Sequence, residues 1–212
     1  MKLIQTIFLL FLLSIYQVSG QNDQATIKIL DRFADNALMA PSISMKFNLV
    51  NDNQADKSID TLAGSVILSK DKYKLILPDN TIWFNGETSW SYLPVEQEVT
   101  ITKPNKKDNT FQNKPSLIFT MYKKDYKCRL IDQKTDSYTL DLYPIDIKSD
   151  ILRVRLTIGK IFLNLISLEY KRRDGIISTL NVLEYDLKQI PSGDTFVFPS
   201  AKYKDAEIVD MR

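Results

Sequence analysis

The stretch Gly64–Ile101, GSVILSKDKYKLILPDNTIWFNGETSWSYLPVEQEVTI, consists of short runs in which apolar and polar residues alternate. Apolar residues recur at spacings of two within these runs, at Val66, Leu68, Tyr73, Leu75, Leu77, Ile82, Phe84, Trp90 and Tyr92. Because successive side chains of a strand point to opposite faces, this spacing predicts that these residues share one face of a sheet. The stretch therefore predicts an antiparallel meander with a large apolar face.

Turn residues separate these runs. Ser69-Lys70-Asp71 and Pro78-Asp79-Asn80 each lie between two of them, and Pro94 follows the last aromatic pair. Asn85-Gly86 is a dipeptide typical of a two-residue hairpin loop, whose backbone needs positive φ angles. A sheet of this kind has to bury its apolar face, so the functional question is what covers it.

The composition is that of one globular domain. The chain has 212 residues, of which 44% are hydrophobic and 25% charged, unlike a disordered or fibrous protein. Its start differs: Lys2 precedes an apolar run from Leu3 to Ile15, and Val18-Ser19-Gly20 provides small residues for cleavage. We therefore expect a cleaved signal peptide at 1–20 and a single domain at 21–212. The alternative, a membrane anchor, needs about 20 apolar residues, more than this run offers.

The charge balance gives no reason to expect a nucleic-acid partner. The formal net charge of +2 becomes +1 once Lys2 is removed with the signal peptide. A nearly neutral chain has no strong general attraction for nucleic acid or for an anionic membrane. Lys103, Lys106, Lys107 and Lys114 form one basic loop, which is interpreted as solvated.

The chain contains no histidine and a single cysteine, Cys128. The lack of histidine excludes Ser-His-Asp and Cys-His catalysis and the usual zinc sites. A lone thiol on the apolar phase of a strand is typical of a core residue. We expect no metal, no cofactor and no enzymatic activity. The enzymatic alternative is a hydrolase that uses carboxylates alone, with Asp141 and Glu169 as candidates, although no motif places them in a cleft.

Two segments have helical character. Gln24–Met39 carries apolar residues at helical spacing with charged residues on the opposite side, and Ala40-Pro41 ends it. Pro115–Lys124 is a second, short helix opened by its proline. Between the first helix and the meander, Ile43–Leu49 alternates as a strand does, and the polar segment Asn51–Asp60 is interpreted as a hairpin loop.

The second half of the chain is predicted to be mostly strands. The expected strands are Glu98–Thr102, Tyr126–Ile131, Ser137–Tyr143, Ile151–Ile158, Ile161–Lys171 and Gly175–Leu187. The alternation slips by one residue between Leu165 and Ile166, as a β-bulge requires. We expect an α+β fold: a single curved antiparallel sheet of about eleven strands forming an unclosed half-barrel, with two or three short helices as a lid over its concave face.

Short helices cannot easily fill the concave side of such a sheet, so we expect an apolar cavity of lipid size. The residues expected to line this acyl-chain cavity are Leu30, Phe33, Phe47, Tyr73, Leu75, Leu77, Trp90, Tyr92, Leu117, Ile118 and Met121. The alternative is that these side chains simply pack against the helices and leave a filled core.

The order of these pieces resembles the LolA-like family of periplasmic outer-membrane lipoprotein carriers. The matching segments are the glycine-led strand Gly64–Leu68, the basic hairpin Lys70–Lys72, the aromatic strand Tyr73–Leu77, the run Asn85–Pro94, Asn113–Pro115, Asp174-Gly175 and Phe196–Pro199. The resemblance covers nearly the whole mature chain, and its ordered set is more specific than any one piece. Where the family has an arginine at the basic hairpin, this chain has Lys70.

The resemblance implies a function and a set of partners. It implies a periplasmic, monomeric carrier of a Gram-negative bacterium that takes acylated lipoproteins from an inner-membrane lipoprotein-releasing transporter to an outer-membrane acceptor. It also implies that Lys70 is the candidate lid latch, although lysine is a weaker bidentate donor than arginine. The alternatives are binding or sensing of another lipid or glycolipid on the same fold.

Overall fold

The computed structural model describes residues 24–104 and 114–212, so the expected signal peptide and most of the basic loop lie outside the described residues. Within these ranges, twelve strands form one sheet. The strands are β1 (Ile43–Asn53), β2 (Ser58–Ser69), β3 (Lys72–Ile76), β4 (Thr81–Phe84), β5 (Ser89–Leu93), β6 (Glu98–Thr102), β7 (Tyr126–Gln133), β8 (Ser137–Pro144), β9 (Ile151–Gly159), β10 (Leu165–Arg172), β11 (Ile176–Asp186) and β12 (Glu207–Asp210).

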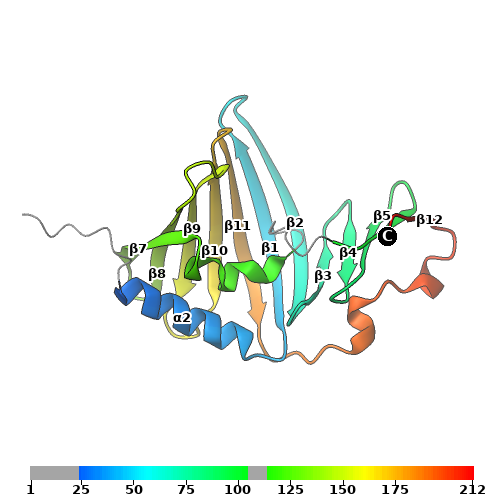
Figure 1. Ribbon diagram of the computed structural model, residues 1–212, viewed down its shortest axis with the longest axis horizontal. Coiled ribbons are helices and arrows are strands. Elements are labelled where there is room, and N and C mark those ends of the chain that lie inside the picture. The colour runs from blue at the N-terminus through cyan, green and yellow to red at the C-terminus, as the bar shows by residue number, and fades with distance from the viewer. Residues whose placement is uncertain (1–23, 105–113) are drawn as a thin grey trace, which may run out of the picture.

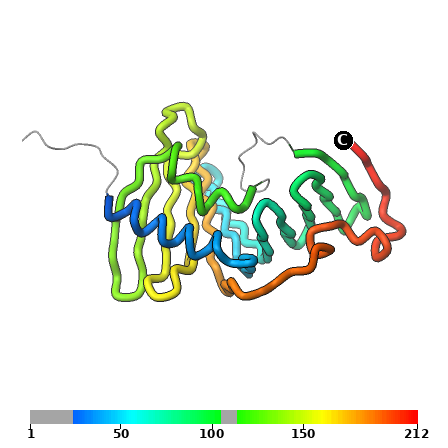
Figure 2. The backbone as a smooth tube through the Cα atoms, turned by 60° about the horizontal axis from the view of Figure 1, so that its bottom comes forward, coloured from blue at the N-terminus to red at the C-terminus, as the bar shows by residue number. Residues whose placement is uncertain are grey.

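The sheet is open and curved. Its order is β12-β6-β5-β4-β3-β2-β1-β11-β10-β9-β8-β7, so β2 to β6 are neighbours in chain order, which confirms the meander. The long strands β1, β2 and β11 stand at the centre, with the short meander strands on one side and the curled strands β7 to β10 on the other (Figures 1 and 2). The predicted unclosed half-barrel is therefore confirmed.

The last strand adds a feature that the sequence did not predict. β12 pairs with β6 in parallel, from Glu207 opposite Glu98 to Asp210 opposite Ile101, whereas the other pairs in the described sheet are antiparallel. The strand has only four residues, and most of them are exposed, so the sequence shows no alternation of apolar and polar residues there. The chain reaches this edge from β11, which lies at the centre of the sheet (Figure 1).

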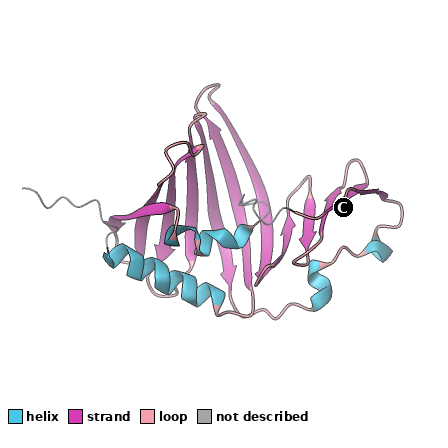
Figure 3. Ribbon diagram, viewed as in Figure 1, coloured by secondary structure: helices cyan, strands magenta, loops and turns pink. Residues whose placement is uncertain are grey.

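The α-helix and the first two 3-10 turns lie across the concave face of the sheet (Figure 3). α2 (Gln24–Leu38) confirms the first predicted helix, and its buried face includes Leu30, Phe33 and Ala37. The second predicted helix is instead two 3-10 turns, η1 (Pro115–Phe119) and η2 (Met121–Lys123), separated by Thr120. Short 3-10 turns of this kind are typical of connecting segments.

Some predicted boundaries were wrong. The segment expected as a hairpin loop at Asn51–Asp60 is mostly strand, because β1 runs to Asn53 and β2 begins at Ser58. Backbone pairing continues there although the apolar alternation has ended. Residues Ile161 and Phe162, expected at the start of a strand, lie in the β9–β10 turn and are 81% and 76% exposed. The bulge is confirmed, since the β10–β9 pairing shifts between Leu165 and Ser167.

The main core lies between the concave face and the helices. It joins α2, η1 and η2 to inward-facing residues of the central strands in one buried cluster. Gly64 of β2 pairs with Phe47 of β1, and a Cβ at Gly64 would lie 2.6 Å from Phe47 Cζ and 2.9 Å from Leu77 Cδ2. Only glycine fits here, because the Phe47 ring lies directly over the backbone.

A second, smaller core lies on the outer face of the meander. Trp83 of β4 packs edge-on against Phe198, with ring centroids 5.4 Å apart, and Tyr92 lies 4.5 Å from Tyr203. Phe198 and Tyr203 belong to the C-terminal strap, which we define as residues 193–210 and which contains η3 (Gly193–Phe196) and η4 (Ser200–Lys202). The strap therefore covers an outer apolar surface that would otherwise face water.

Candidate functional site

The concave face brings together most of the residues predicted to line a cavity. Leu30, Phe33, Phe47, Tyr73, Leu75 and Ile118 are buried in one cluster, and Leu77 and Met121 are partly buried against it. Leu117 is half-buried in η1. These residues come from α2, the central strands, the meander and the two 3-10 turns, so the fold gathers them from distant parts of the sequence.

Trp90 and Tyr92 are not on this face, which corrects the prediction for them. The loop between β4 and β5 has four residues, Asn85–Thr88, where two were expected, and an even number in either case keeps Trp90 out of phase with Phe84. Phe84 pairs with Ser89, and Trp83 pairs with Trp90. Cross-strand partners share a face. The inward phase therefore passes from Phe84 to Ser89, and the two aromatic residues join the outer core with Trp83.

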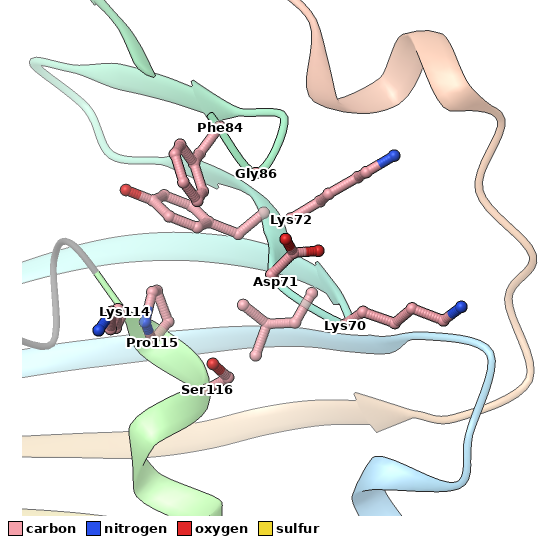
Figure 4. A pocket seen from close by; sticks show the side chains of 10 residues that line it. Lys70, Asp71, Lys72, Phe84, Gly86, Lys114, Pro115 and Ser116 are labelled. Atoms are coloured by element: carbon pink, nitrogen blue, oxygen red, sulfur yellow. The ribbon is translucent and has the colours of Figure 1, made fainter. Parts of the chain in front are cut away.

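A pocket of about 280 Å³ lies between the turn that joins β2 to β3 and the start of η1 (Figure 4). We call it the seam pocket. Its apolar lining is Leu68, Tyr73, Phe84 and Pro115, and its polar lining is Lys70, Asp71, Lys72, Gly86, Lys114 and Ser116. The volume is slightly below the range of about 300–1,000 Å³ that is usual for small-molecule sites.

The aromatic wall of the seam pocket is uncharged. Tyr73 is 3% exposed, and its ring lies 5.4 Å from that of Phe84 on the neighbouring strand. Burial raises the pKa of the Tyr73 hydroxyl to about 12, although a hydrogen bond with Ser89 opposes the shift. The wall therefore stays apolar at any physiological pH. The sequence predicts that Phe84 faces inward but does not predict that it lines the cavity.

The expected lid elements hold each other in place. The rings of Phe33 in α2 and Phe119 in η1 have centroids 5.2 Å apart. The Tyr122 hydroxyl of η2 donates a hydrogen bond of 2.5 Å to Asp31 Oδ1 of α2. Burial and this neighbouring carboxylate raise the pKa of Tyr122 well above its usual range. Moving η1 and η2 away from the sheet therefore also requires breaking their contacts with α2.

Lys70, the lid latch candidate, lies in an exposed turn of the backbone. It occupies the two-residue β2–β3 turn with a φ of 56°, and its side chain is exposed. Lys70 and the first residues of η1, Pro115 and Ser116, line the same seam pocket. Its role as a latch stays a prediction.

The carboxylates of the hydrolase alternative are held by arginines on the outer face. Arg155 donates to both oxygens of Asp141, from Nε at 2.6 Å and from Nη2 at 2.8 Å, and Arg153 pairs with Glu169. Burial raises the pKa of Asp141, but the hydrogen bonds from Arg155 and Tyr143 outweigh it, so the net shift is downward. A carboxylate of this kind stays ionised and is a poor general acid.

Neither Cys128 nor a cluster of metal-binding side chains provides a second candidate site among the described residues. Cys128 is buried, and burial raises the pKa of its thiol to about 11, which disfavours the nucleophilic thiolate. Among residues 24–104 and 114–212, no group of three or more His, Cys, Asp and Glu side chains is arranged to hold a metal ion. No helix in this part of the chain is both long enough and apolar enough to cross a membrane.

Comparison with known protein families shows which family the chain belongs to. The family described as outer membrane lipoprotein carrier protein LolA matches residues 20–173, most of the chain. The chain belongs to the LolA family. Among curated proteins, none matches this sequence significantly.

Solved structures resemble this chain at low sequence identity. An uncharacterized conserved protein from Thermus thermophilus is 14% identical, with a TM-score of 0.57 over 88% of this chain and 99% of that one. A LolA superfamily protein from Nitrosomonas europaea is 14% identical, with a TM-score of 0.43 over 82% and 97%. A DUF1329 family protein from Desulfovibrio piger is 13% identical, with a TM-score of 0.47 over 85% and 99%. The Thermus protein supports the fold alone.

Proposed function

We propose that this protein is a periplasmic carrier that binds the acyl chains of lipoproteins on its concave face and shuttles them from the inner to the outer membrane. The observation that carries the proposal is that, in the part of the chain that the structure describes, only one helix and two short turns cover the apolar concave face. A broad apolar surface on the central and meander strands is covered by α2 and two short 3-10 turns, and the seam pocket opens beside η1. Membership of the LolA family supports the same function.

Burial of the acyl chain supplies the affinity in this proposal. Each methylene group removed from water contributes about 0.8 kcal/mol. An entering chain competes with lid contacts such as that of Phe33 with Phe119, so ligand binding costs part of the existing core. The partners are acylated lipoproteins, an inner-membrane transporter that releases them and an outer-membrane acceptor, and the carrier acts as a monomer.

Two substitutions on adjacent residues of β3 test the role of the concave face. Leu75 is 2% exposed on the concave side, whereas Ile76 is 41% exposed and points to the outer side. A carboxylate at Leu75 costs several kcal/mol unless it protonates or reaches water, and a carboxylate at Ile76 is solvated. Leu75→Glu should abolish saturable binding of a fluorescent fatty-acid analogue, and Ile76→Glu should retain it.

Circular dichroism and thermal melts must accompany this comparison, because Leu75→Glu can also unfold the protein. Leu75→Ala provides a milder change that removes apolar surface without adding charge. Equal binding by the wild type and a folded Leu75→Glu protein would contradict the proposed function.

A further inference from the structure

The seam pocket combines an apolar floor with a basic rim. The floor is built from Leu68, Tyr73 and Phe84 of the sheet and from Pro115 of η1. The rim carries three lysines, Lys70, Lys72 and Lys114, and a single carboxylate, Asp71. The pocket thus has the two parts that an amphiphile requires, and on its rim Lys70 and Lys72 outnumber Asp71.

The carboxylate on the rim, Asp71, packs against Gly86, which lines the same pocket. A Cβ placed on Gly86 would lie 2.8 Å from Asp71 Oδ2, so this carboxylate packs against the backbone of the β4–β5 loop. Gly86 has a φ of +98°, which fixes that loop in a conformation that favours glycine. The rim therefore has two lysines of the β2–β3 turn region, Lys70 and Lys72, against this one carboxylate.

The backbone that carries two of the lysines is fixed. Ser69 pairs with Lys72 at the end of the β2–β3 ladder, and Ser69 Oγ donates a 2.9 Å hydrogen bond to the carbonyl of Pro41. The side chains of Lys70 and Lys72 extend away from the pocket (Figure 4), and both residues are exposed. Each has a long, flexible stem, so its ammonium group can turn toward a charge bound at the mouth.

We propose that the seam pocket is the head-group site for an anionic amphiphile. Its acyl chain lies on the Tyr73 and Phe84 wall and continues under η1, and its carboxylate or phosphate lies at the pocket mouth beside Lys70 and Lys72. This inference rests on the proposed function, because it uses the same concave face. It adds a preference for a negatively charged head group over a neutral one.

The size of the effect follows from the exposure of the lysines. An exposed ion pair contributes about 0.2–1 kcal/mol, so two lysines together give a preference of roughly twofold to thirtyfold for the charged head group. The preference should weaken in high salt, which screens exposed charges. Charged and neutral ligands share the same apolar contribution to binding. The ratio of their affinities therefore measures the contribution of the lysines alone.

A fluorescent polyene fatty acid and its methyl ester test the proposal, at a pH well above the usual carboxyl pKa of about 4. Three proteins are compared: the wild type, the variant Lys70→Gln/Lys72→Gln and the control Lys127→Gln/Lys171→Gln. The control removes two exposed lysines from the outer face of β7 and β10 and changes the net charge equally. Wild type and control should bind the acid several-fold tighter than the ester, and the rim variant should bind the two almost equally.

Displacement by lysophospholipids identifies the source of the charge. If an anionic lysophospholipid displaces the probe better than a zwitterionic one, and only with the rim lysines present, phosphate is accepted as well as carboxylate. If only the fatty acid depends on these lysines, the site is one for carboxylates. An acid-to-ester ratio that is the same in all three proteins would overturn the proposal, even with tight ester binding. Failure of the ester to bind the wild type would instead count against the acyl-binding face itself.

Discussion

The Tyr122 hydroxyl of η2 donates a 2.5 Å hydrogen bond to the carboxylate of Asp31 in α2, and this bond joins the two elements that cover the concave face. A hydrogen bond to a charged group contributes about 1.5–3 kcal/mol. Tyr122→Phe should therefore lower the free energy of unfolding by up to this amount, measured by chemical denaturation. If η1 and η2 move during uptake, the same variant should also bind a fluorescent acyl probe faster in stopped-flow experiments.

The phenylalanine variant keeps the ring and so keeps the packing of the buried Tyr122 side chain. Tyr203→Phe is the matched control, because Tyr203 lies in the outer core with Phe198 and Tyr92 and not beside the lid. Unchanged uptake by a destabilised Tyr122→Phe protein would show that the chain enters without movement of η2.

Gly64 should not tolerate a side chain. Alanine at this position places its Cβ 2.6 Å from Phe47 Cζ, closer than van der Waals contact allows. Overpacking of this kind costs about 1–3 kcal/mol. Gly64→Ala should lower the midpoint of urea unfolding, and a second change, Phe47→Leu, should restore part of the loss by removing the clashing ring. Two losses that simply add would mean that Phe47 does not clash with the new methyl group.

The Tyr185 hydroxyl is buried without a hydrogen-bond partner among the described residues. Burial raises the pKa of this phenol well above its usual range. Removing an unsatisfied buried hydroxyl relieves its desolvation penalty of about 1–3 kcal/mol. Tyr185→Phe should therefore leave the melting temperature unchanged or raise it. Tyr143→Phe is the contrasting variant, because its hydroxyl donates to Asp141 at 3.0 Å, and it should lower the melting temperature.

The stability contributed by Asp141 should depend on pH. Its pKa in the folded protein lies below the ordinary value of 3.8, so its contribution is present above that value and is lost as the pH falls through the folded pKa. Asp141→Asn should destabilise the protein by about 2 kcal/mol at neutral pH. The difference from the wild type should shrink below about pH 4 in denaturation curves recorded across the acid range. A difference that stays constant as the pH falls through the acid range would contradict the ion-pair interpretation.

In the meander, the alternation of apolar and polar residues predicts correctly which face some residues occupy and incorrectly for others. Leu75 and Ile82 face inward as expected, because the β3–β4 turn pairs them directly. Trp90 does not, because a loop with an even number of residues, two or four, puts Trp90 on the same outer face as its partner Trp83. Spacing within a strand thus predicts which residues share a face of that strand. Whether a hairpin loop has an even or an odd number of residues decides which residues of the next strand continue that face.

The outer core and the seam pocket depend on contacts between segments that are distant in sequence. Phe198 covers Trp83, and Pro115 forms a wall opposite Tyr73, although neither pair is suggested by any local pattern. The sequence around Phe198 is a brief apolar piece that matches the family, and it gives no sign of the contact with Trp83. Tertiary contacts of this kind are set by how the whole sheet curves, and a local period does not encode that curvature.

Native mass spectrometry of the protein purified from a periplasmic extract tests the central claim most directly. The account predicts that the wild type and Ile76→Glu carry the added mass of an acylated lipoprotein or lipid. Folded Leu75→Glu should appear mainly at the mass of the unliganded chain, because its concave face is charged. If all three proteins, including the wild type, have only the unliganded mass, the concave face is a filled core and the protein is not a carrier of acyl chains.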